Sequence, residues 1–134
     1  MRDIVFRGKR VDNGEWISGD LRHWKNGKVG IHNNALNFTL VVIPETVGQY
    51  TGLKDKNGRR IFEGDFIRHC REAALVCFGE YAFNIELKTH IGFHLDWDKQ
   101  NYYRKDIAFW AKKRAIEVIG NIHDNPELLK EGMQ

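Results

Sequence analysis

Turn-forming residues recur about every ten positions in this chain, and no other feature constrains its fold as strongly. Asp12-Asn13-Gly14, Asn57-Gly58 and Glu63-Gly64-Asp65 each place Gly or Asn where a tight turn needs a positive φ angle. The segments between turns are short, and several alternate polar and apolar residues as half-buried strands do. No long segment carries the period of an amphipathic helix. We therefore expect a mainly β, hairpin-rich fold.

The clearest strand is predicted at 38–43, which is apolar and β-branched and is stopped by Pro44. The runs on either side of Asp12-Asn13-Gly14 predict a β-hairpin with one buried face. A turn is expected at Gly79-Glu80. The full set of expected strands is 3–11, 15–23, 29–32, 38–43, 66–69, 74–78, 82–87, 91–97 and 117–122.

Two short helices are predicted near the end of the chain. Pro126 follows two capping residues and precedes Glu127, a combination typical of a first helical turn, so we expect a short C-terminal helix over 124–132. A second helix is predicted at 106–114, with Asp106 as its N-cap.

The length of 134 residues indicates one domain, which can bury a core without disulfide or metal crosslinks. No segment approaches the ~18 apolar residues of a membrane span, and the first ten residues lack the apolar run of a signal peptide. We therefore expect a cytoplasmic protein without a membrane partner. The net charge of +3 is too small to imply nucleic acid by itself, but residues 1–64 carry 11 basic and 7 acidic side chains, which suggests a basic side.

The two cysteines, Cys70 and Cys77, are too few for a disulfide scaffold, and we expect buried, reduced thiols. Together with His90 and His94 they partly match the spacing of a two-Cys, two-His zinc finger. Six residues separate the cysteines where such a site uses two to four, and no helix is predicted to present the histidines. We expect no metal site.

Catalytic patterns are weak throughout the chain. Asp96 and Asp98 flank Trp97 with the spacing of a same-face carboxylate pair, but a solvated strand end that runs into a polar loop explains them better. The sequence contains no nucleophile elbow, phosphate-binding loop, dinucleotide-binding glycine pattern or zinc-protease motif. We expect no enzyme activity, no catalytic residues and no cofactor.

The best binding candidate is the segment 102–114, which combines cations with aromatic side chains. Cations neutralise phosphates and aromatic rings stack on bases, so nucleic acid is one interpretation. An oligomer interface is another, because Tyr, Trp and Arg are enriched there. A third is a core segment with its aromatic residues inside and its charges outside, and we expect this environment for Trp110. The candidate contact residues are Tyr102, Tyr103, Arg104, Lys105, Trp110, Lys112, Lys113 and Arg114.

Three segments resemble the YopX-like family of phage and prophage proteins. The central one runs from Gly48-Gln49-Tyr50-Thr51-Gly52 through Asn57-Gly58 to Glu63-Gly64-Asp65. An opening segment at 6–20 and a closing segment at 117–129 agree with it, whereas 70–115 shows little resemblance. The resemblance implies a small, mainly β protein encoded by mobile elements, with no established activity and no catalytic residues to carry over.

Gly64-Asp65 also resembles the turn that opens a strand in SH3-like barrels, where Asp65 would bond nearby backbone amides. We therefore expect a small SH3-like β-barrel in one YopX-like domain over 1–134. Its parts are an N-terminal hairpin region at 1–48, a barrel region at 49–123 and the helix at 124–132. Asn57, Gly58, Gly64 and Asp65 are predicted to be structural turn residues.

Two functions remain open. The first is a non-catalytic phage or prophage accessory module that works through protein contacts, with an unidentified host or phage protein and as a homo-oligomer, because short strands leave sheet edges that a second copy can pair. The alternative is a nucleic-acid-binding module that uses 102–114.

Overall fold

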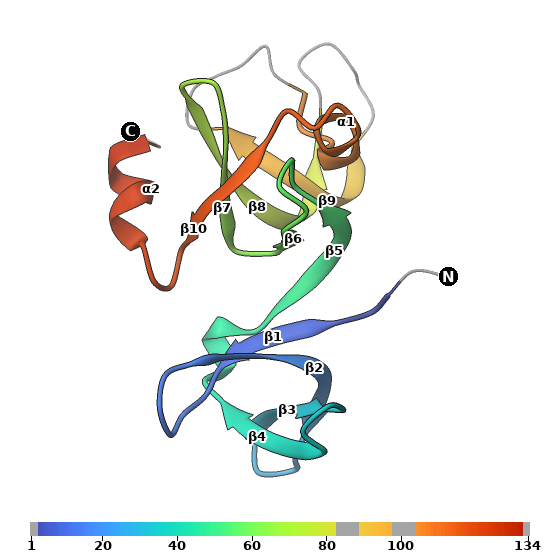
Figure 1. The fold of residues 1–134 in the computed structure, drawn as a ribbon, viewed down its shortest axis with the longest axis vertical. Helices are drawn as coiled ribbons and strands as arrows, with labels where there is room; N and C mark the ends of the chain where they lie inside the picture. The colour runs from blue at the N-terminus through green and yellow to red at the C-terminus, as the bar shows by residue number, and fades with distance from the viewer. Residues whose placement is uncertain (1–2, 83–88, 98–103, 133–134) are drawn as a thin grey trace. The chain divides into compact units, whose positions relative to one another are not determined.

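The computed structural model describes residues 3–82, 89–97 and 104–132, and it divides into two compact units, 1–52 and 53–134 (Figure 1). The strands form two antiparallel sheets. The first has the order β4-β3-β2-β1-β5-β6 and the second the order β10-β7-β8-β9. Strand β5 (Gly48–Lys54) carries the chain from the first unit into the second.

The first unit is a curled sheet with a small apolar core. Its buried side chains are Ile17, Val29, Ile31 and Val42; Val29 and Ile31 share a face of β3 because they are two residues apart, and Val42 lies opposite Val29 in the ladder. Partly buried Phe6 and apolar residues from other strands pack against them. The elements are β1 (Phe6–Lys9), β2 (Trp16–His23), β3 (Val29–Asn33), β4 (Phe38–Val42) and the 3-10 turn η1 (Pro44–Thr46).

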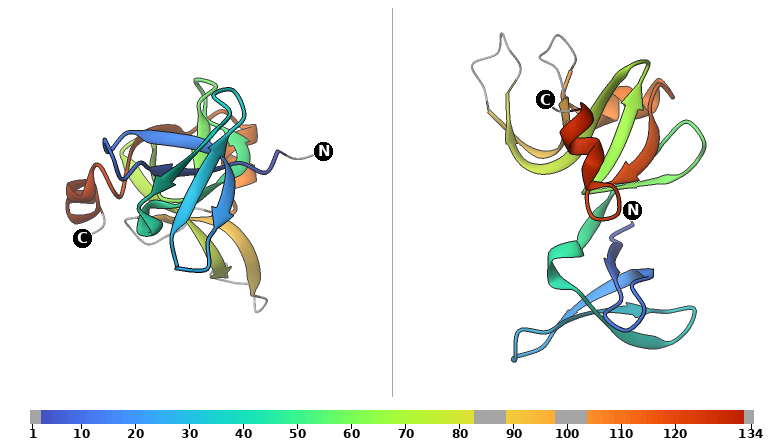
Figure 2. Two further views of the ribbon diagram at one scale, coloured as in Figure 1. Left: turned by 90° about the horizontal axis from the view of Figure 1, so that it is seen from below. Right: turned by 90° about the vertical axis from the view of Figure 1, so that its left-hand side faces the viewer.

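The second unit holds the larger core, which the four-stranded sheet and the first helix build together. Its elements are β6 (Arg60–Phe62), β7 (Asp65–His69), β8 (Glu72–Tyr81), β9 (His90–Trp97), α1 (Ile107–Lys112), β10 (Glu117–Asn121) and α2 (Pro126–Gly132). The ladder between β7 and β8 reaches only to Phe66 opposite Leu75, whereas β8 and β9 pair on as far as Tyr81 opposite His90. The paired β8 and β9 therefore extend past β7 (Figure 2).

The expected mainly β fold is confirmed, but the closed SH3-like barrel is wrong: the described residues form two open sheets. Alternation of polar and apolar residues identifies a strand and its buried face, but it does not say whether the first and last strands pair. The division of a single domain at residues 48 and 123 stays a prediction.

The predicted turn at Gly79-Glu80 is also wrong, because β8 continues through it and Gly79 lies opposite Gly92 in the ladder. A glycine inside a strand mimics a turn signal when only the sequence is read. Residues 83–87, the larger part of the strand expected at 82–87, lie outside the described residues. The strands β5 and β6 were not predicted.

Both helices are confirmed with shorter bounds than the predicted 106–114 and 124–132. Asp106 occupies the N-cap position of α1, but it makes no side-chain capping bond, because its carboxylate binds the guanidinium of Arg104 instead. Helix α2 begins at Pro126 as predicted and lies near β8. None of the described helices has the length and apolar character that a bilayer span requires.

Candidate functional site

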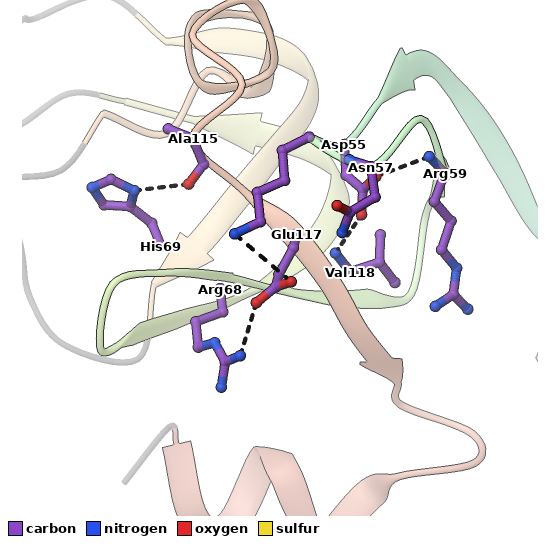
Figure 3. A network of polar contacts seen from close by, with 9 residues as sticks. Asp55, Asn57, Arg59, Arg68, His69, Ala115, Glu117 and Val118 are labelled. Atoms are coloured by element: carbon purple, nitrogen blue, oxygen red, sulfur yellow. Dashed lines mark hydrogen bonds and ion pairs between the residues drawn. The ribbon is translucent and has the colours of Figure 1, made fainter.

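Asp55 organises the turn between β5 and β6. One carboxylate oxygen accepts the backbone amides of Asn57 and Arg59, each at 2.9 Å, and the other accepts the amide of Val118 in β10, also at 2.9 Å (Figure 3). The side chain is 6% exposed, so these bonds satisfy a charge that burial would otherwise penalise. Asp55 thus closes the turn and attaches it to β10. The sequence analysis missed its role, although an Asp two positions before Asn-Gly is a signal for such a turn.

The predicted turn residues lie where the sequence analysis placed them. Gly58 has φ +81° and Gly64 has φ +93°, both in the region that side chains disfavour. Asp65 is 1% exposed and accepts the amide of Phe62 at 2.8 Å, the backbone contact expected of it. Asn57 is exposed in the turn that Asp55 closes. The central segment that resembles the YopX-like family thus forms and stabilises backbone turns.

Of the two aromatic residues of the predicted contact segment that the structure describes, Trp110 is buried and Phe109 is half-buried. Trp110 is 7% exposed, as expected of a core residue, and its indole nitrogen donates to the carbonyl of Arg104 at 2.7 Å. Trp97 donates to the same carbonyl at 2.9 Å and meets Trp110 edge to face. The backbone carbonyl of Lys105 accepts the amide of Leu95. Tyr102 and Tyr103 lie outside the described residues.

The cations of this segment differ in what they contact. Arg104 binds Asp106 through two hydrogen bonds of 2.9 and 2.8 Å, and its guanidinium carbon lies 4.4 Å from the ring centre of Phe109. The ammonium of Lys113 lies 4.9 Å from the same ring. Lys112, Lys113 and Arg114 are exposed at the end of α1, where cations also suit the helix dipole.

Two further cations lie beside β10. The guanidinium of Arg68 donates to Glu117 at 2.8 Å, and the ammonium of Lys56 lies 3.9 Å from the other oxygen of the same carboxylate (Figure 3). The hydrogen bond from Arg68, and secondly the charge of Lys56, lower the pKa of Glu117 below its ordinary value. Glu117 therefore stays ionised at neutral pH and holds both cations at the surface.

The Cys and His candidates do not form a metal site in the described residues, where no group of three suitable side chains comes together. His90 and His94 instead stack on Tyr81, with ring centres 5.4 and 4.8 Å away. Burial raises the pKa of the Cys77 thiol to about 11. The expected burial of Cys70 is wrong: it is exposed, because it occupies the turn from β7 to β8 with φ +54°.

An apolar surface that sequence reasoning did not single out lies on the outer part of β8 and β9. Phe78 is 56% exposed and Ile91 72% exposed, and half-buried Phe93 meets Phe78 edge to face at 5.0 Å. These three residues, called here the hairpin apolar face, continue the face that carries Val76 and Leu95 in the core. Because alternate residues of a strand share one face, the apolar face of β8 and β9 continues beyond the end of β7.

Comparison with known proteins identifies the family. The family model described as YopX protein matches residues 5–130, and the chain therefore belongs to the YopX family. It is similar to the crystal structure of protein EF1440 from Enterococcus faecalis, with 23% identity, a TM-score of 0.50, and coverage of 96% of this chain and 99% of that one. At this identity the likeness shows the fold alone. No curated protein matches the chain.

Proposed function

We propose that this YopX-family protein is a non-catalytic binding module that works through protein contacts and assembles with further copies of itself. The observation that carries the proposal is the hairpin apolar face, Phe78, Ile91 and Phe93. Large apolar side chains that continue a core face beyond the core are typical of interaction surfaces. We place the module in the bacterial cytoplasm as the product of a phage or prophage gene.

The position of β9 favours a second copy as the partner. This strand is at the end of the described sheet order. Residues 105 and 106 already bond its inner part at Leu95 and His94, so it is the outer part, 90–93, that would offer edge-strand backbone groups to another strand. Two antiparallel copies of β9 around a twofold axis would join two sheets and place two hairpin apolar faces side by side. An interface of this kind is self-complementary, because each strand supplies the same residues to the other.

The polar residues of the family-type segment support a non-catalytic role. The carboxylates of Asp55 and Asp65 accept backbone amides and so hold turns in place. Groups that are engaged in this way are structural, whereas a general acid or base must reach a substrate.

The proposal is tested by light scattering of the purified protein and by affinity capture from the bacterial host, with and without nuclease. We expect a particle larger than 15.7 kDa and protein contacts that survive nuclease. A monomer at all micromolar concentrations, which captures only nucleic acid, would contradict it.

Nucleic-acid binding is the second candidate function. The observation that favours it is the run of exposed cations at the end of α1, Lys112, Lys113 and Arg114. Exposed cations bind phosphates whether or not aromatic residues accompany them. The internal position of Trp110 removes it as a base-stacking residue.

A further inference from the structure

Three separate segments of the second unit, each with exposed cations, lead to the start of β10. The amide of Lys56 donates to the carbonyl of Ile116 at 3.0 Å, and Arg68 lies opposite Glu117 in the ladder between β7 and β10. Ile116 follows two residues after Arg114, so the chain runs from the end of α1 directly into this region. We call these five cations the basic ridge: Lys56, Arg68, Lys112, Lys113 and Arg114.

The charge of the basic ridge is only partly compensated by the carboxylates that contact its segments. All five cations are exposed, and the side chains of Lys56 and Arg68 are 46% and 50% exposed. Glu117 is shared between these two cations, while Asp55 is buried and directs its oxygens at backbone amides. A surface of this kind attracts a polyanion with closely spaced charges.

The aromatic residues next to the basic ridge are already engaged. Two cations approach the ring of Phe109, and Trp110 packs in the core against Trp97. Within the described part of this region, the protein therefore offers cations for the phosphates of a nucleic acid and no aromatic ring for its bases. Phosphates of a duplex meet this requirement, because their bases are stacked inside the helix.

We propose that the basic ridge binds the phosphate backbone of duplex nucleic acid without reading its sequence. The proposal deepens the second candidate function: it rests on nucleic-acid binding, places it on the fold, and joins Lys56 and Arg68 to the cations of α1.

The test is the affinity of the full chain for a labelled 20-base-pair duplex, measured by fluorescence anisotropy between 50 and 200 mM salt. Binding that uses four phosphates should lose roughly 100-fold in affinity over this range, because each released counterion contributes about 0.9 to the slope of log affinity against log salt. The matching single strand should bind more weakly, and a duplex of unrelated sequence equally well.

Two matched triple variants locate the site. Lys112→Gln, Lys113→Gln and Arg114→Gln together should lower the salt slope by about three and weaken binding at 50 mM salt. The control is Arg22→Gln, Lys25→Gln and Lys28→Gln, which removes the same charge from exposed positions in the first unit. The control should bind almost as the wild type does, and both variants should melt as the wild type does.

A pair of single variants tests the share of Lys56 and Arg68. Glu117→Gln removes the carboxylate that occupies both cations, so it should tighten duplex binding. Glu45→Gln makes the same charge change at an exposed position of η1 in the first unit and should tighten it less. Equal effects would overturn the assignment of Lys56 and Arg68 to the site.

Several results would overturn the proposal as a whole. If the wild type binds neither duplex nor single strand at 50 mM salt, nucleic-acid binding fails together with the basic ridge. If it binds but the two triple variants behave alike, the basic ridge alone fails. Tighter binding to the single strand than to the duplex would show that the surface recognises a different ligand. So would vesicles of anionic lipid, if the triple variant at 112–114 lost binding to them as strongly as it lost binding to the duplex.

Discussion

A carboxylate oxygen of Asp55 accepts the backbone amide of Val118 at 2.9 Å, across 63 positions of sequence. The other oxygen closes the turn in which Asp55 itself lies. The buried side chain of Asp55 thus joins the turn between β5 and β6 to β10, near the end of the chain. This contact gives the central segment an architectural role.

The Asp55→Asn variant should therefore be strongly destabilised. An amide can accept with only one atom, so its NH₂ group would face a backbone N–H in a buried position. We expect a loss of about 2–3 kcal/mol in the free energy of unfolding, measured by urea titration. Asp20→Asn, which changes an exposed Asp of β2, is the control and should stay within about 0.5 kcal/mol of the wild type.

Gly58 should tolerate a side chain poorly because of its backbone angle and not because of crowding. A Cβ atom added there meets nothing within 4 Å, yet φ is +81°. Gly58→Ala should cost about 1–2 kcal/mol of stability. Gly92→Ala is the matched control, because it also has open space but no positive φ. Equal melting temperatures of the two variants would contradict this explanation, which extends to Gly64 at φ +93°.

Trp110→Ala should act on stability first. The side chain lies in the core with its indole nitrogen bonded to the carbonyl of Arg104, so removing it leaves a cavity and takes away one of the two indole donors to that carbonyl. We expect a loss of about 3–5 kcal/mol in unfolding free energy. Trp24→Ala, at a position that is 42% exposed, should cost less. A Trp110→Ala protein that melts normally but loses nucleic acid would show that the ring is a binding residue.

The two thiols should differ in reactivity with iodoacetamide. The pKa of Cys77 is raised to about 11, so its thiolate is a minor species at pH 8, and its alkylation should accelerate steadily from pH 8 to pH 10. Exposed Cys70 should be modified before Cys77 at pH 8. Mass spectrometry of timed samples gives the order, and faster modification of Cys77 in the folded protein would contradict its burial.

Local sequence signals predicted the strands and turns well because their causes are local. Asn57-Gly58 and Glu63-Gly64-Asp65 supply positive φ angles and capping oxygens within a few residues, and Pro126 fixes a helix start in the same way. The family could likewise be identified from short segments. The internal role of Trp110 followed from its apolar neighbours.

The features that sequence reading missed depend on contacts between distant segments. Sheet closure is decided by which edges pair, and alternation within strands carries no information about that. The bond from Asp55 to Val118, and the ion pairs of Lys56 and Arg68 with Glu117, likewise join segments far apart in the chain. The hairpin apolar face became visible only when the ladder showed that β8 and β9 pair beyond the end of β7.

The central claim, assembly through the hairpin apolar face, is tested most directly by the molar mass of one variant in solution. Phe78→Ser removes a side chain that is 56% exposed on this face, and Phe38→Ser removes one that is 62% exposed on β4. Light scattering at matched micromolar concentrations should give an oligomer for the wild type and for Phe38→Ser, and 15.7 kDa for Phe78→Ser. An oligomer of unchanged mass in the folded Phe78→Ser protein, or a monomeric wild type, would contradict the claim.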